Sequence, residues 1–255
     1  QLEANLVMAS AGANFYGGIN NMKFPVFSGI SSTFVSEDGS NGTVATLGTT
    51  GSVTLSPKKL ISIVNMSQES MIQNTGLEAA LQRNMAANIA STMESAFLAN
   101  DDLTNAPTSL FKDATSVATS VISVANVQKM ETDLLAANVS LEGARMAYIM
   151  NPAAYADVKA LPQVSNVSAL YDNADKRLNG YFSFITSNLN SGGTASKTAA
   201  LFGDFSKVHI AQFGGLDILF DPYTNSATGV PRMVITSLVD AAAVQAATFQ
   251  KNLEA

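Results

Sequence analysis

Hydrophobic residues recur at helical spacing over one long segment of the chain. From residue 77 to about residue 99 they return at every fourth position, and alanines between them widen the apolar face. This spacing predicts a single helix, which at about 1.5 Å per residue is roughly 35 Å long. The apolar stripe drifts slowly around the helix axis and consists of Leu77, Leu81, Met85, Ile89, Met93 and Phe97.

Strand patterns and turn residues precede this helix. Residues 26–35 predict a strand, residues 37–42 a turn, and residues 43–47 with 51–64 a returning strand broken by glycines. Together they predict a long two-stranded ribbon. An isolated ribbon is marginally stable in water, so it must lie on this chain or on another copy. Residues 1–27, interrupted by glycines and one proline, predict an extended arm.

Polar residues mark where two further helices begin. Ser67 followed by Glu69 predicts the start of a short helix, because a serine caps free N–H groups and a carboxylate meets the positive end of the helix dipole. Asn151 followed by Pro152 predicts a second start, with a helix over 152–159.

The remainder of the chain mixes short helices and strands without regular βαβ alternation, which predicts an α+β fold. One hairpin is expected around Gly192 and Gly193, between 181–189 and 197–202. The other predicted elements are strands at 117–124, 145–150, 207–213, 216–220 and 231–244 and a helix at 127–137.

The composition is unusual in its shortage of charge. Charged residues make up 13% of the chain, against about 25% in ordinary globular proteins. Hydrophobic residues reach 47%, enough for a folded core. A surface built from uncharged polar residues is poorly protected against association, which indicates a chain that contacts neighbours. An ordinary domain with a neutral surface is the alternative that composition leaves open.

Charge and residue types exclude several classes of function. The net charge is −6 and the 14 basic residues are scattered, which argues against a nucleic-acid binder held by phosphate contacts. The chain has no cysteine, so it has no disulfide, thiol nucleophile or cysteine metal site. No apolar run is long enough to span a bilayer, and the first residues show no signal-peptide pattern.

Motifs that would carry chemistry are incomplete. His209 is the only histidine, and without a Gly-x-Ser-x-Gly elbow it is expected to be a packed or surface side chain. A phosphate-binding loop has a glycine directly before its lysine and another five residues earlier. Residues 191–198 have Ser196 and Ser191 at these two positions, so they do not form such a loop. Residues 38–42 resemble the opening of a calcium loop, but the glutamate at its twelfth position is missing. We therefore predict no catalytic, cofactor-binding or metal site.

Two other groups have both a structural and a functional interpretation. Asp101 and Asp102 follow the end of the predicted long helix, and we expect them to lie in a solvated loop. The alternative is that they hold a cation between copies of the chain. Phe24, Phe27 and Phe34 could form an aromatic face for single-stranded nucleic acid, but no basic groove accompanies them. We expect these phenylalanines to be packing anchors.

The order of the predicted elements over nearly the whole chain resembles the major capsid proteins of tailed phages of the Hong Kong 97 type. FVSEDGS at 34–40 is similar to the strand and acidic turn of the family's extended loop, and LSPKKL at 55–60 to its return strand. The other residues that carry the resemblance are Ser67 with Glu69, at the cap of the family's first helix, and Phe97-Leu98, at the end of its spine helix.

This resemblance implies a capsid fold with peripheral and axial domains, in which the ribbon lies across a neighbouring subunit and the arm reaches a further one. The implied segments are an N-terminal arm at 1–27, an extended loop (β-ribbon) at 28–56, a peripheral domain at 57–120 with a spine helix at 77–99, an axial domain at 121–205, and C-terminal strands at 206–255 that return to the two domains. The implied assembly contacts are Phe34, Val35, Glu37, Lys58 and Lys59.

The implied function is structural and not enzymatic. Hexamers and pentamers of the chain would close into an icosahedral virion shell around double-stranded DNA, without sequence-specific DNA binding and without a membrane. The implied partners are the phage portal, a scaffold or protease and decoration proteins, and assembly would occur in the host bacterial cytoplasm. Family precursors commonly lose an N-terminal segment to a phage protease, so a mature, processed chain would account for Gln1.

Three other functions compete with this one. An encapsulin-like compartment would share the fold. A flagellin or surface-layer polymer is disfavoured, because flagellins need long apolar helices at both ends and this chain begins with a glycine-rich arm and ends on strands. An enzyme is disfavoured further by the single histidine and the lack of clustered carboxylates.

The paired lysines Lys58 and Lys59 are expected to mark a joint rather than a ligand site. Neighbouring residues of a strand point to opposite faces, so the two side chains cannot clamp one phosphate together. Pro57 lacks a backbone donor and should lie at the entry of the strand. We expect the ribbon to re-enter the folded body here, with both lysines available for ion pairs to neighbouring subunits.

The same segment generates a prediction about covalent linkage. Some members of the family join subunits through a lysine of the extended loop, but no lysine lies between Lys23 and Lys58. We therefore expect mature particles to dissociate into single chains on a denaturing gel. A ladder of covalent oligomers would contradict this expectation.

Overall fold

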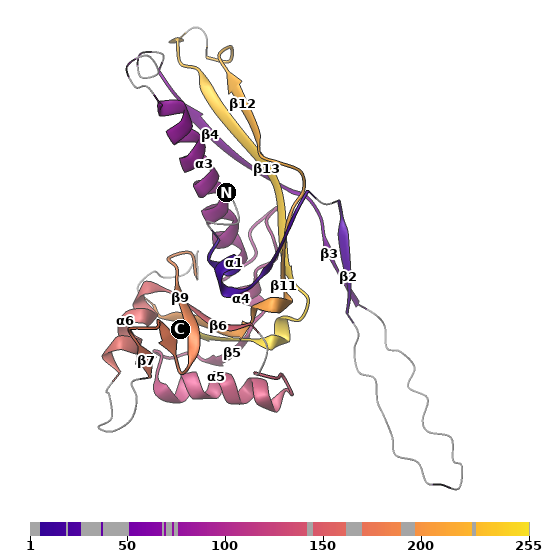
Figure 1. Cartoon of the computed structure of the whole chain (residues 1–255), viewed down its shortest axis with the longest axis vertical. Coiled ribbons are helices and arrows are strands. Elements are labelled where there is room, and N and C mark those ends of the chain that lie inside the picture. Colours follow the sequence, from indigo (N-terminus) through magenta and orange to yellow (C-terminus); the bar gives the residue numbers. More distant parts are fainter. Residues whose placement is uncertain are drawn as a thin grey trace.

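The fold is described from a computed structural model. The structure describes residues 6–18, 20–26, 37, 51–67, 69, 73, 76–141, 145–161, 170–189, 197–225 and 228–254. Figure 1 shows an upper body of one long helix against a sheet, a lower body with a second sheet, and a two-stranded ribbon that leaves from between them.

The upper body pairs α3 (Leu77–Phe97) with a five-stranded sheet, called here the upper sheet. The predicted stripe of α3 is confirmed, since its last four members are buried and the first two are half-buried. They pack on β4 and β13 of the sheet. The strand order is β1 (Asn14–Gly17), β11 (Val208–Gln212), β13 (Arg232–Ala243) and β12 (Asp217–Asp221), with β4 (Lys58–Asn65) also paired to β13.

The lower body is built on a seven-stranded sheet, called here the lower sheet. Its central strands are fully buried, and its core includes Tyr148 stacked on Phe202 with 4.1 Å between ring centroids. The strand order is β5 (Thr115–Ala118), β14 (Phe249–Leu253), β10 (Ala199–Asp204), β6 (Met146–Met150), β9 (Tyr181–Ile185), β8 (Arg177–Leu178) and β7 (Tyr171–Asp172). The helical segments that accompany the two sheets are α4 (Leu110–Asp113), α5 (Val124–Ala136), α6 (Pro152–Ala160), η2 (Phe205–Lys207) and η4 (Ala246–Thr248).

Side-chain caps fix where the helices of the lower body begin. The Asn151 side chain accepts a hydrogen bond from the Ala154 N–H at 2.8 Å, and Pro152 occupies the first turn, which confirms the predicted start of α6. α5 begins at Val124, three residues earlier than expected, because Ser123 caps it by accepting from the Asn126 N–H. At the predicted helix after Ser67, Glu69 and Gln73 are helical and the residues around them lie outside the described residues.

The predicted hairpin between 181–189 and 197–202 is wrong. β9 and β10 do not pair with each other, because β6 lies between them and pairs with both. All five residues of β6 are buried, as expected of a strand apolar on both faces that occupies the centre of a sheet. Gly192 and Gly193 themselves lie outside the described residues.

The predicted extended arm is also wrong over residues 6–17. This segment forms α1 (Val7–Ala11) and β1, which pairs in parallel with β11. Met8 is fully buried, and the carboxylate of Glu94 on α3 accepts hydrogen bonds from the Val7 and Met8 N–H groups at 2.7 and 3.2 Å. Gly12 ends α1 in the left-handed conformation at φ +117°, so this glycine stops a helix rather than extending an arm.

The Glu94 contact predicts a specific loss of stability. Because hydrogen bonds to a buried charged group are strong, Glu94→Ala should lower the free energy of unfolding by about 2–3 kcal/mol. It should also expose the first residues to proteolysis. Urea unfolding of the unassembled chain, followed through tyrosine fluorescence, measures the change.

Glu78 on the same helix provides the matched control. It is exposed, and its carboxylate accepts a bond from the Gln82 side chain at 3.3 Å. Glu78→Ala should cost well under about 1 kcal/mol. Equal losses in the two variants would show that Glu94 does not anchor the N-terminal segment.

Candidate assembly surfaces and the ribbon joint

At the base of the ribbon the predicted returning strand is confirmed, whereas its partner strand begins earlier than expected, at residues assigned to the arm. β2 (Met22–Val26) pairs antiparallel with β3 (Gly51–Leu55), and the register runs from Met22 opposite Leu55 to Val26 opposite Gly51. Of the ribbon beyond this base, the structure describes only Glu37, which is exposed. The predicted contacts Phe34 and Val35 lie outside the described residues.

A buried carboxylate holds the joint where β3 passes into β4. Asp240 on β13 accepts the Ser56 N–H at 2.9 Å and forms an ion pair with the Lys58 ammonium at 3.1 Å. Asp240 is 3% exposed, and a buried carboxylate is costly unless it is paired. These bonds therefore fix the path of the chain on both sides of Pro57.

An aromatic stack holds the other strand of the ribbon base. The ring of Phe24 on β2 lies against that of His209 on β11, with centroids 4.1 Å apart and planes 17° apart. The Tyr16 hydroxyl is 3.2 Å from Nδ1 of His209. Burial, together with the charge of Lys207, lowers the pKa of His209. His209 and Phe24 are thus packed side chains, as the sequence predicts.

The upper sheet exposes an apolar surface on the side away from α3, which we call the outer face. Leu60 and Val64 of β4 pack on the core, so Ile61 and Ile63, which alternate with them along the strand, point outward. Ile63 is 56% exposed, and Leu219 of β12, in register with the outward Val234, is 60% exposed. The outer face consists of Lys59, Ile61, Ile63, Leu219, Val234, Thr236 and Leu238.

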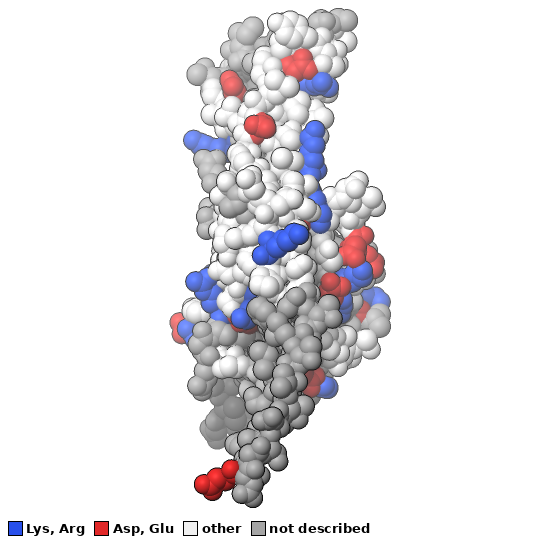
Figure 2. Space-filling model, turned by 90° about the vertical axis from the view of Figure 1, so that its right-hand side faces the viewer, with Lys and Arg blue, Asp and Glu red and all other residues white. Residues whose placement is uncertain are grey.

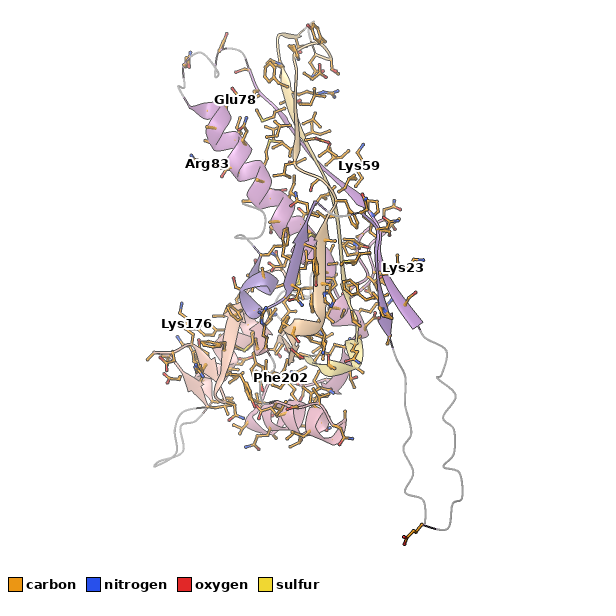
Figure 3. The ribbon with its side chains drawn as sticks, turned by 45° about the vertical axis from the view of Figure 1, so that its right-hand side comes forward. Lys23, Lys59, Glu78, Arg83, Lys176 and Phe202 are labelled. Atoms are coloured by element: carbon orange, nitrogen blue, oxygen red, sulfur yellow. The ribbon has the colours of Figure 1, made fainter. Side chains whose placement is uncertain are left out.

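Such a surface has the character of a contact area, because exposed apolar patches of this kind mark protein–protein interaction sites. Figure 2 views the molecule from its ribbon side and shows few charged side chains on the upper body. Figure 3 places Lys23 and Lys59 on this side, whereas Glu78 and Arg83 project from α3. Ile218 and Phe220 of β12, in register with the buried Ile235 and Met233, point to the other side of the sheet, where both are more than two-fifths exposed.

The two predicted lysines have different surroundings. Lys58 is half-buried and is engaged by Asp240 of its own chain. Lys59 is exposed, lies opposite Leu238 and forms no ion pair among the described residues. They do point to opposite faces, and only Lys59 joins the outer face.

The other acidic residues of interest are engaged within the chain. Asp102 accepts the Ser109 N–H at 2.9 Å and forms an ion pair with Lys112, and these bonds lower the pKa of its carboxyl. Hydrogen bonds from Thr224 and Tyr223 lower the pKa of Asp221. Within the described ranges, no group of three histidine, cysteine or acidic residues is placed to hold a metal ion. Within the same ranges, no helix is long and apolar enough to cross a membrane.

Sequence reasoning did not identify Asp240 or Glu94 as structural anchors. A signal for both is present, because each is a lone acid in an otherwise uncharged stretch, SLVDAAAV for Asp240 and ASTMESAF for Glu94. Acidic residues are almost never fully buried unless they are paired. A lone carboxylate within a buried strand or helix stripe therefore predicts a partner, although the pattern does not say which one.

Comparison with known proteins connects this geometry to a family. The model of the phage capsid family matches residues 1–252. No curated protein matches the chain.

Solved structures show the same fold at low identity. The capsid of a native GTA particle is 19% identical, with a TM-score of 0.75 over 95% of this chain and 88% of that chain. The chain from Mycobacterium phage Bobi is 13% identical, with a TM-score of 0.72 over 98% of this chain and 90% of that one. The chain from Gordonia phage Cozz is 13% identical, with a TM-score of 0.70 over 98% and 86%.

The joint predicts that substitutions of the two lysines act differently on folding. Lys58→Met removes one partner of a buried carboxylate and should lower the free energy of unfolding by about 1–2 kcal/mol. Lys59→Met removes an exposed charge and should change it by less than about 0.5 kcal/mol. Urea unfolding of the unassembled variants measures both, and equal effects would show that the Asp240 contact does not stabilise the joint.

Proposed function

Because the chain belongs to the phage capsid family and is a structural, major capsid protein, we propose that it builds its shell by laying the ribbon of one copy across the outer face of the next. Hexamers and pentamers formed in this way close into an icosahedral shell around double-stranded DNA. The chain acts by burying surface between copies and catalyses no reaction. Compartment shells and flagellin-like polymers are not favoured by the family match.

The observation that carries this proposal is the apolar outer face next to an anchored ribbon base. Ile63 and Leu219 leave more than half of their surface in water in the single chain. A neighbouring copy that covers them removes this area from water at about 25 cal/mol per Å². The ribbon base lies beside this body and is held by side chains at both strands, so it directs the ribbon outward from a fixed point.

Charge complementarity selects the contact between copies. Glu37 on the ribbon is exposed, and Lys59 on the outer face is exposed without an ion pair among the described residues. We pair Glu37 of one copy with Lys59 of the next and place Phe34 and Val35 beside the apolar residues of that face. Lys58 remains within its own chain.

We extend the proposal to the division of the chain. We assign the peripheral domain to residues 57–120 with its spine helix, the axial domain to residues 121–205, and the ribbon to residues 28–56. The C-terminal strands of residues 206–255 enter both sheets, since β13 belongs to the upper sheet and β14 to the lower one. The proposed partners outside the shell wall are a portal, a scaffold or protease and decoration proteins, with assembly in the bacterial cytoplasm.

Charge exchange tests the proposal directly. Glu37→Lys and Lys59→Glu should each reduce the yield of particles, because each places like charges together at the contact. The double variant restores opposite charges and should recover much of the yield. Electron microscopy of the purified proteins counts closed shells with five- and six-fold clusters.

The unfolding free energy of each variant is the control, and it should stay within about 0.5 kcal/mol of the unmodified chain. A double variant no better than the single ones would contradict the pairing of Glu37 with Lys59. Filaments, or a stable monomer, from the unmodified chain would contradict the shell itself.

A further inference from the structure

One imidazole ring connects three strands at the base of the ribbon. His209 belongs to β11 of the upper sheet and stacks on Phe24 of β2 at 4.1 Å. Its ring also lies 5.7 Å from that of Tyr16 on β1, at an interplanar angle of 30°, and Nδ1 is within hydrogen-bonding distance of the Tyr16 hydroxyl. Figure 3 labels Lys23, the neighbour of Phe24 on β2, which marks the position of the ribbon base.

Few other contacts attach the ribbon base to the body. Within the described ranges, β2 and β3 form a separate two-stranded sheet that shares no ladder of backbone hydrogen bonds with the upper or lower sheet. Leu55 packs with Ala211 and Phe213, and the Asp240 joint fixes the end of β3. Phe24 thus carries side-chain contacts of β2 with the body: its ring stacks on that of His209, lies 6.2 Å from that of Tyr16 and packs against Ala211 and Phe213.

There is also space for the base to move. A cavity of about 260 Å³ lies between β3 and the body. Val53, Thr54 and Ser56 line it from the ribbon side, and Ala241–Ala243 of β13 line it from the other. Because β3 is not tightly packed there, loss of the stack on β2 would let the base rotate about the joint at Asp240.

The surroundings of His209 favour its neutral form. The ring is half-buried, and no carboxylate among the described residues is hydrogen-bonded to it. The groups that face it are the Tyr16 hydroxyl from β1, the Phe24 ring from β2, the uncharged Ala242 from β13 and the cationic Lys207 from η2. A protonated ring would gain some cation–π attraction to Phe24, but it would lose solvation and meet the charge of Lys207.

We propose that His209 is an acid-sensitive latch, whose neutral ring holds the ribbon base against the body and whose protonation loosens it. Burial lowers the pKa of His209 below its ordinary value of 6.5, so the loosened state binds the proton more tightly. The stabilisation of the docked base is therefore complete above about pH 6.5 and is lost as the pH falls through the lowered pKa. The consequence for shells, a change of ribbon direction between copies, rests on the proposed function.

The experiment uses the unassembled chain, so its outcome does not depend on shell formation. The absence of cysteine allows spin labels at Lys23→Cys on β2 and Lys129→Cys on α5, both exposed positions. The distance distribution between the labels is measured from about pH 7.5 to about pH 5, where ordinary carboxyl groups stay largely ionised. The single histidine resonance reports the titration of His209 in the same samples.

A narrow distribution at high pH should broaden as the histidine titrates, with a midpoint below 6.5. His209→Phe keeps the stacked ring without the proton site and should stay narrow at every pH. His209→Ala removes the ring and should be broad at every pH. The latch is refuted if the distribution of the unmodified chain stays narrow while His209 titrates, or if His209→Phe still broadens in acid.

Discussion

A ribbon of two strands must be anchored where it leaves the body, because two strands alone are marginally stable in water. In this chain the carboxylate of Asp240 supplies that anchor. It bonds to Ser56 and Lys58, which are more than 180 residues away in the chain, and so joins the re-entering strand to β13. The position of the ribbon base, β2 and β3, on the body follows from this contact and from the stack of Phe24 on His209.

Glu94 performs the same task for the N-terminal segment. Its buried carboxylate binds two N–H groups at the start of α1 and the side chain of Asn188, so it joins the first residues, α3 and the lower body. The chain therefore places two of its few charges inside, where they organise segments that are distant in sequence. Its exterior is correspondingly poor in charge, as a surface that is covered by other copies can be.

Local spacing explains which parts of the fold were predictable. The stripe from Met85 to Phe97 and the pair Asn151-Pro152 specify helices through neighbouring residues, and both predictions are confirmed. The position of β6 between β9 and β10, the packing of residues 6–17 and the partner of Lys58 depend on contacts between distant segments. Periodicity carries no information about such contacts. The same limit applies to the candidate surface, because the pattern shows that Ile61 and Ile63 share a face but not that this face is left uncovered.

The central claim is that the ribbon of one copy covers the outer face of another. An electron cryomicroscopy map of the assembled particle tests it most directly, because the path of residues 27–50 can be followed from its base to the surface that it contacts. We expect the ribbon to cross the boundary between copies, with Glu37 beside Lys59 and with Ile61 and Ile63 covered. A ribbon folded back on its own body, or an outer face left open to solvent in the closed shell, would contradict this account.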